Sequence, residues 1–157
     1  MLFCLLFNFS VLAVEVGETA PDFTLKDIEA GKADFTLSDL RGKTVYLDFW
    51  ASWCGPCLRS LPLYNELYSK YREKGLVVVG INIDNPIEDG LDFLLDNPLD
   101  FKIPSDPDGE VTALYEIYGM PTSYLIDAEG VVHLVHEGFR DGDLELIEKE
   151  IEALLAH

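Results

Sequence analysis

Residues 44–57 read TVYLDFWASWCGPC and decide the fold of this 157-residue chain. The run Thr44–Trp50 is β-rich and almost continuously apolar, which is typical of a strand covered on both faces. Residues 76–83 form a second run of the same kind, and between the two runs apolar side chains recur at helical spacing over residues 57–74. The pattern predicts a βαβ unit with two central, parallel strands and a right-handed crossover.

The rest of the chain alternates helical and extended patterns without repeats or linkers. The further expected elements are a hairpin, a helical turn, two short helices, a second hairpin and an amphipathic helix, over residues 23–37, 38–42, 87–96, 110–118, 122–136 and 141–155. Together they predict one α/β domain, in which a central mixed sheet has helices on both faces and a hairpin extends its N-terminal side.

The composition restricts the class of function. With 48% hydrophobic residues the chain has the profile of a folded domain. It carries 29 acidic and 11 basic residues, a formal charge of −18, which would repel phosphate groups. This charge disfavours binding to nucleic acid and to anionic membrane surfaces. The three cysteines are an odd number, so they cannot all pair within one chain.

Residues 1–14, MLFCLLFNFSVLAV, resemble the apolar region and cleavage end of a secretory signal. No Lys or Arg precedes the apolar run, so a signal peptide here would be truncated at its start. We expect residues 1–14 to be a signal peptide that contains Cys4, and residues 15–157 to be the domain. The expected location is then periplasmic or otherwise extracytoplasmic. The alternatives are a cytoplasmic protein and a buried N-terminal strand or helix.

Cys54 and Cys57 carry the chemistry that the sequence indicates. A Cys-x-x-Cys pair where a strand runs into a helix places the first thiol among unpaired backbone N–H groups, which favours its thiolate. Pro56 fits there because its missing N–H has no bond to lose. Cys54 is thus the expected nucleophile and Cys57 the resolving thiol. Half of a zinc site, completed by His133 and His136, and an inert structural disulfide are the alternatives.

The segment around these cysteines resembles a known active site. Residues 48–57, DFWASWCGPC, are similar to the active-site segment of the thioredoxin superfamily. Pro62 falls where thioredoxins have a helix-kinking proline, residues 120–122 (MPT) resemble the cis-proline motif, and Gly138 falls near a glycine of the substrate groove. Residues 16–25 (VGETAPDFTL) and 40–43 (LRGK) resemble the opening of TlpA/ResA-like thiol-disulfide oxidoreductases and the related peroxiredoxins of the AhpC/TSA-redoxin group.

This resemblance covers residues 16–156 and implies a thioredoxin fold, a three-layer α/β/α sandwich. It implies an enzyme that exchanges a Cys54–Cys57 disulfide with protein substrates, in the reducing direction. It implies a cis peptide before Pro121 and a set of substrate-binding residues, namely Trp53, Gly55, Pro56, Met120, Pro121 and Gly138. We expect a monomer without cofactor or metal, supplied by a membrane or soluble thiol donor.

Two other functions compete with this expectation. A peroxiredoxin-like thiol peroxidase would share the opening segment, but the P-x-x-x-T-x-x-C context of its reactive cysteine is missing from the chain. A non-catalytic metal-binding or structural module could be built on the same fold.

Asp48 is the third expected catalytic residue. A carboxylate inside an apolar strand should have a raised pKa, and it could accept the proton of Cys57. Asp at this position matches thioredoxin, whereas TlpA/ResA-like proteins more often have Asn. Ser60 stands where relatives that act in cytochrome c maturation carry Glu, which weakens a cytochrome assignment. Gly80 replaces the Lys that often accompanies this Asp in thioredoxins.

One acidic stretch remains. Residues 84–110 hold nine acids against the single Lys102, and we expect them to form a solvent-exposed face that selects against acidic partners.

Overall fold

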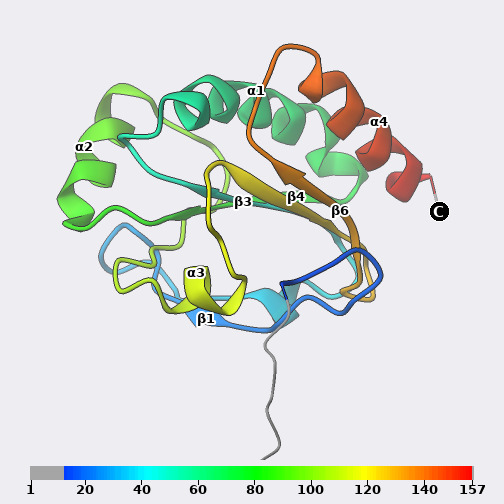
Figure 1. Cartoon of the computed structure of the whole chain (residues 1–157), viewed down its shortest axis with the longest axis horizontal. Helices are drawn as coiled ribbons and strands as arrows, with labels where there is room; N and C mark the ends of the chain where they lie inside the picture. Colours follow the sequence, from blue (N-terminus) through cyan, green and yellow to red (C-terminus); the bar gives the residue numbers. More distant parts are fainter. Residues whose placement is uncertain (1–12, 157) are drawn as a thin grey trace, which may run out of the picture.

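A computed structural model describes residues 13–156. Its centre is a sheet in the order β4-β3-β5-β6, in which β3 and β4 are parallel and the other neighbours are antiparallel. The strands are β3 (Thr44–Trp50), β4 (Leu76–Asn82), β5 (Thr122–Ile126) and β6 (Val132–Glu137). Figure 1 shows helices on both sides of this sheet, which confirms the expected mixed α/β architecture.

One face of the sheet is covered by α1 (Gly55–Tyr71) and α4 (Asp143–Leu155), with α2 (Ile87–Asp96) beside α1. The other face carries α3 (Glu110–Leu114) and the expected N-terminal hairpin, β1 (Thr24–Leu25) and β2 (Phe35–Thr36). Short 3-10 helices follow β2 at Leu37–Leu40 and α1 at Arg72–Lys74. Each face therefore has its own apolar core.

β3 separates the two cores, and all seven of its residues are buried. Its side chains alternate between the faces, because successive residues of a strand point to opposite sides. Tyr46 and Trp50 pack under α1 and α4, whereas Leu47 and Phe49 pack under α3 and the hairpin. The near-continuous apolar pattern of β3 thus reflects burial on both sides.

β4 is the last named strand on its side of the sheet, so the expectation that both β3 and β4 are central needs correction. Its outer edge is covered by an irregular segment, because the N–H groups of Gly80 and Asn82 donate to the carbonyls of Lys102 and Pro104 at 2.9 Å each. The apolar pattern of β4 is explained by this cover together with the two cores.

Two helix boundaries also differ from expectation. α1 begins at Gly55, two residues early, because Cys54 caps it: the Cys54 Sγ accepts the Cys57 N–H at 3.3 Å. α3 ends at Leu114 instead of reaching residue 118, and Glu116 takes a positive φ of 52° that no helix continues through. The residues after α3 are thereby free to form a loop next to Cys54.

The expected signal peptide, with Cys4, lies outside the described residues except for positions 13 and 14. Val14 is 6% exposed and belongs to the core under the hairpin. Within residues 13–156, no helix has the length and apolar character needed to cross a bilayer.

Candidate active site

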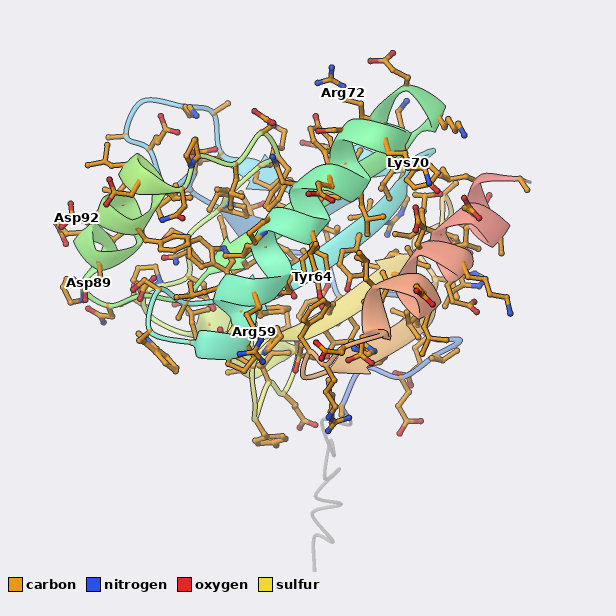
Figure 2. All side chains as sticks on the ribbon, turned by 90° about the horizontal axis from the view of Figure 1, so that it is seen from above. Arg59, Tyr64, Lys70, Arg72, Asp89 and Asp92 are labelled. Carbon is orange, nitrogen blue, oxygen red and sulfur yellow. A yellow bond between two sulfur atoms is a disulfide. The ribbon has the colours of Figure 1, made fainter. Side chains whose placement is uncertain are left out.

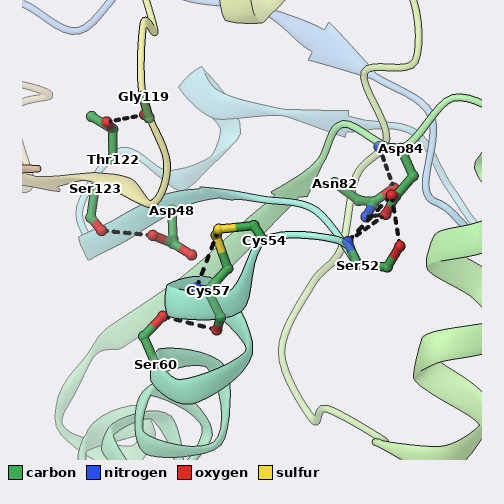
Figure 3. The surroundings of a disulfide bond; sticks show 10 residues. All are labelled: Asp48, Ser52, Cys54, Cys57, Ser60, Asn82, Asp84, Gly119, Thr122 and Ser123. Atoms are coloured by element: carbon green, nitrogen blue, oxygen red, sulfur yellow. Dashed lines mark hydrogen bonds between the residues drawn. A yellow bond between two sulfur atoms is a disulfide. The ribbon is translucent and has the colours of Figure 1, made fainter. Parts of the chain in front are cut away.

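Cys54 and Cys57 lie where β3 runs into α1 and are joined by a disulfide with a Cα–Cα distance of 5.2 Å (Figure 3). Cys54 is 5% exposed, whereas Cys57 is fully buried. The N–H of Cys57 points at the Cys54 Sγ, and so does the positive end of the α1 dipole. The outer sulfur is therefore the one that a substrate can reach and the one that the helix stabilises as an anion.

A groove of about 440 Å³ opens beside Cys54. Its lining is mainly apolar and comes from the active-site loop, the start of α1, the residue after β4, α3 and the loop before β5. The lining residues are Trp53, Cys54, Pro56, Ile83, Thr112, Ile117, Tyr118, Gly119 and Met120. Trp53 and Tyr118 are 68% and 90% exposed. Two large aromatic side chains thus stand free at the border of an apolar groove that contains the reactive sulfur.

The structure brings three of the six expected substrate-binding residues into this groove, Trp53, Pro56 and Met120. Gly55 is exposed at the helix start, and the Met120–Pro121 peptide is cis, as the resemblance implied. Pro121 itself is buried, and its carbonyl accepts the Gly138 N–H at 2.7 Å. Pro121 and Gly138 thus support the groove through the backbone and do not line it.

Sequence reasoning missed the other groove residues, above all Ile83 and Tyr118. Tyr118 stands directly before Gly119 and Met120, so its place next to the cis-proline motif was a usable signal. Trp50 is fully buried in the α1-side core, and its indole N–H donates to the Gly80 carbonyl at 3.2 Å.

Asp48 is 1% exposed and lies on the α1 side of β3, and Figure 3 shows its carboxyl group on the side of the disulfide where Ser123 lies. Its Oδ1 accepts the Ser123 hydroxyl at 2.7 Å, and its Oδ2 has no partner. Burial raises the pKa of Asp48 to about 8, against a smaller lowering by the Ser123 bond. The expected burial and raised pKa are present, and they give a carboxyl group that changes its charge near neutral pH.

The replacement of Lys by Gly80 has a steric reason. Gly80 lies directly opposite Asp48 in the β3–β4 ladder. A Cβ at position 80 would come within 2.9 Å of the Phe101 ring and 3.1 Å of the Trp50 indole nitrogen. No side chain fits there without a shift, so no cation reaches Asp48 from β4.

Ser60 lies one turn after Cys57, is fully buried, and donates to the Cys57 carbonyl at 3.1 Å. Ser60 thus places a bonded hydroxyl group, and no carboxylate, one turn after Cys57.

The acidic stretch contains a residue that sequence reasoning placed wrongly. Asp84 was expected on a solvent-exposed face, but it is fully buried at the end of β4. Its carboxylate accepts the Ser52 N–H at 2.9 Å, the Ser52 hydroxyl at 2.8 Å and the Asn82 amide at 2.6 Å (Figure 3). Asp84 thus holds the loop two residues before Cys54.

Asp106 is the second exception, with 2% exposure. It accepts the Thr112 N–H and hydroxyl at 2.8 and 2.7 Å, so it serves the first turn of α3. The other seven acids of the stretch are exposed, and Figure 2 shows Asp89 and Asp92 on the outer side of α2. The acidic stretch therefore forms the expected exposed face, but Asp84 and Asp106 are not part of it.

The two histidines of the zinc alternative have local partners instead. His133 pairs with Asp127 at 2.7 Å, and His136 pairs with Asp143 at 3.1 Å. Over residues 13–156, no three or more His, Cys, Asp and Glu side chains gather in a way that could hold a metal ion.

A mixed sheet with a Cys-x-x-Cys pair at the start of α1 and a cis-proline before β5 defines a thioredoxin-fold protein of the dithiol–disulfide class. The comparisons with known proteins agree. Residues 16–135 match the model of the AhpC/TSA family, and the chain belongs to this family as a TlpA/ResA-like member of the thioredoxin superfamily.

Named relatives narrow the class further. The chain is 42% identical over 125 residues to the thiol-disulfide oxidoreductase ResA of Oceanobacillus iheyensis, covering 78% of this chain and 65% of that protein. It is 38% identical over 142 residues to ResA of Geobacillus kaustophilus, covering 90% and 79%. The chain thus spans about two thirds to four fifths of these relatives.

Among solved structures, the chain resembles one from Chlorobium tepidum described as a thiol:disulfide interchange protein of the DsbE type. The TM-score is 0.87 and the identity 45%, with coverage of 91% of this chain and 99% of that one. These relatives and the Cys54–Cys57 pair support dithiol–disulfide exchange as the chemistry of this site.

Proposed function

We propose that this chain is a protein-disulfide reductase, with Cys54 as nucleophile, Cys57 as resolving thiol and Asp48 as proton acceptor. The observation that carries the proposal is the unequal placement of the two sulfurs. The Cys54 Sγ caps α1 at the border of the apolar groove, and Cys57 is buried behind it beside Asp48.

The first step begins from the reduced form. The Cys54 thiolate, stabilised by the N-terminus of α1, attacks one sulfur of a substrate disulfide. A bond forms between the Cys54 Sγ and that sulfur, the substrate disulfide breaks, and its second sulfur leaves as a thiolate with the electron pair. The product is a mixed disulfide held in the groove.

The second step involves the two buried groups, Cys57 and Asp48. The Asp48 carboxylate takes the Cys57 proton, and the resulting thiolate attacks the Cys54 Sγ. The Cys54–Cys57 disulfide forms and the substrate leaves as its second thiolate, so two electrons have passed to the substrate. With a pKa of about 8, Asp48 is ionised in about one molecule in ten at pH 7, which balances base strength against availability.

The substrates are proteins with disulfides. An extended segment fits the groove, where it would meet the exposed ring of Trp53 and the Met120 backbone beside the cis peptide. A separate thiol donor, membrane-bound or soluble, returns electrons to Cys54–Cys57. The signal-like residues 1–14 favour action outside the cytoplasm, with the chain acting as a monomer.

Insulin reduction by dithiothreitol tests the activity. We expect the purified chain to accelerate it, Cys54→Ser to abolish the acceleration, and Cys57→Ala to accumulate a mixed disulfide on Cys54. Absence of acceleration by the wild-type chain would overturn the reductase assignment. Peroxide consumption that depends on Cys54 and exceeds insulin reduction would favour the peroxidase alternative.

A further inference from the structure

Two aromatic side chains stand in solvent beside the reactive sulfur. Six large apolar side chains of residues 13–156 are exposed, and Trp53 and Tyr118 are the two aromatic ones among them. Both border the groove that contains Cys54, and Tyr118, at 90%, is the most exposed of the six. Exposed aromatic surface that gathers at one groove is typical of a binding site.

The backbone on either side of Tyr118 is held in place. The Ile117 N–H donates to the Thr112 carbonyl at 3.0 Å. The Gly119 carbonyl accepts the Thr122 hydroxyl at 2.7 Å (Figure 3). The Tyr118 side chain therefore projects into solvent from between two bonded backbone positions.

The backbone around Trp53 is held in the same way. Ser52 donates its N–H and its hydroxyl to the buried Asp84 carboxylate at 2.9 and 2.8 Å (Figure 3). On the other side, the Cys54 N–H donates to the Ala51 carbonyl at 3.1 Å. Aromatic rings that project from fixed backbone positions lose little conformational freedom when a ligand binds, which favours binding.

The groove between the two rings favours apolar groups. Ile83, Ile117 and Met120 are half-buried and line it. Among the described residues that line the groove, none is charged. The Thr112 hydroxyl already donates to Asp106 at 2.7 Å. A charged side chain in the groove would leave water without meeting an opposite charge, whereas an apolar side chain would gain favourable contact.

The mixed disulfide of the proposed reaction decides which part of a substrate lies in the groove. Because Cys54 lines the groove, a substrate cysteine bonded to its sulfur lies at the wall. A chain advances by at most about 3.6 Å per residue, so the residues directly before and after that cysteine lie within reach of the groove. The groove volume of about 440 Å³ suits a short segment of chain.

We infer that Tyr118 is a specificity-determining residue, which favours protein substrates with a large apolar side chain next to the reacting cysteine. The rings of Tyr118 and Trp53 contact this side chain at the border of the groove, and the apolar lining contacts the rest of it. The inference rests on the proposed disulfide reduction, because it needs a mixed disulfide on Cys54.

Short peptides of defined sequence test this selectivity. The substrates are symmetric disulfides of the blocked peptide Gly-X-Cys-X-Gly, in which X is Phe, Gln or Ala. Each is mixed with the reduced full chain after removal of dithiothreitol, and the peptide thiol released gives a second-order rate constant. The proteins are wild type, Tyr118→Ala, Tyr118→Phe and Leu95→Ala. Leu95 is the matched control, because it is 81% exposed on α2 and is not among the residues that line the groove.

We expect wild type to reduce the Phe peptide about tenfold faster than the Ala and Gln peptides, because an aromatic side chain gains apolar contact and an amide loses water. In Tyr118→Ala this preference should fall to about threefold or less, because the Phe peptide loses the ring contact and the Ala peptide does not. Tyr118→Phe, which retains the ring, and Leu95→Ala should keep the wild-type preference.

An equal preference for the Phe peptide in Tyr118→Ala and in wild type, with native circular dichroism, would overturn the inference. A wild-type dimer in sedimentation that is lost in Tyr118→Ala would also overturn it, because a second copy would then occupy the groove. If wild type reduced neither insulin nor any of the peptides, the proposed reductase function would fail instead, which separates the two failures.

Discussion

The two faces of the sheet each bury a pair of tyrosines, packed alike and bonded differently. Tyr46 and Tyr64 meet edge to face at 4.9 Å on the α1 face, and Tyr115 and Tyr124 do so at 5.2 Å on the α3 face. Tyr115 donates to the Pro21 carbonyl at 2.7 Å and Tyr124 to the Tyr115 carbonyl at 3.3 Å. The hydroxyls of the first pair have no partner.

The difference follows from what each pair faces. The α3-side pair faces backbone carbonyls, which never change their charge, so fixed hydrogen bonds can form and stabilise the core. The α1-side pair lies on the same face of the sheet as Asp48, because Tyr46 and Asp48 are two residues apart on β3. Burial raises the pKa of Asp48 to about 8, so its charge changes near neutral pH. The pair with completed bonds thus lies on the face without Asp48, and the pair without bonds lies on the face of the carboxyl group that we propose as the proton acceptor.

Among the substitutions that test this comparison, Asp48→Asn should change the free energy of unfolding most. The pKa of Asp48 is raised in the folded chain, so between about pH 4 and pH 8 the folded state holds a proton that the unfolded state releases. Wild-type stability therefore falls as pH rises through this window, and that of Asp48→Asn does not. At pH 7 we expect Asn to be more stable by on the order of 4 kcal/mol.

Urea unfolding of the oxidised chains at pH 5 and pH 8 measures this difference. Asp92→Asn on the exposed side of α2 is the control and should parallel wild type. If the stability of wild type and of Asp48→Asn changed with pH in parallel, burial would not raise the pKa of Asp48.

Asp84→Ala tests a carboxylate whose bonds are complete. Its removal leaves the Ser52 and Asn82 donors without their partner, so we expect a loss of about 3 kcal/mol of unfolding free energy. Asp108→Ala, an exposed acid of the same stretch, should change it by less than about 0.5 kcal/mol. Equal effects of the two substitutions would contradict the anchoring role of Asp84.

Removing a hydroxyl from each tyrosine pair should change the free energy of unfolding less, and differently in the two pairs. Tyr115→Phe breaks a satisfied bond and leaves the Pro21 carbonyl unpaired, which should cost about 1–2 kcal/mol. Tyr64→Phe removes an unpaired hydroxyl, so stability should stay within about 0.5 kcal/mol of wild type or rise. Urea unfolding at pH 6 distinguishes them, and a large loss in Tyr64→Phe would mean that its hydroxyl is bonded after all.

The smallest effect on stability is expected at Trp53, which is 68% exposed. Trp53→Ala should change the free energy of unfolding by less than about 0.5 kcal/mol, because little area is lost from the core. It should nevertheless lower insulin reduction several-fold, since the ring borders the groove at Cys54. Leu95→Ala, an exposed apolar residue of α2, is the control and should leave both quantities unchanged.

Much of this fold could be predicted from local patterns. β3 and α2 occupy the expected residues 44–50 and 87–96, because the apolar period of each is uninterrupted and its ends carry turn signals. The Cys54–Cys57 pair and the burial of Asp48 were also expected, because both lie in the continuous segment in which an apolar strand leads directly into a helix.

What could not be predicted depends on contacts between distant elements. Tyr64 reads as an ordinary core residue of its helix, and only the packing of α1 on β3 brings its ring edge to face with that of Tyr46, at 4.9 Å. Asp84 and Asp106 stand in a run of acids that suggests solvent exposure, but backbone and side-chain donors from other segments bury them. Charge density along a sequence does not report such partners.

The hydrogen bonding at the two edges of the sheet also affects whether the protein aggregates at high concentration. The Gly17 and Ala20 N–H groups donate to the Val132 and Gly130 carbonyls at 2.8 and 2.9 Å, which occupies the start of the β6 edge. Residues 102–105 occupy the β4 edge in the same way. Open strand edges are templates for aggregation. At these positions a second copy or a misfolded neighbour meets backbone groups that are already bonded, so growth of the sheet between molecules is disfavoured.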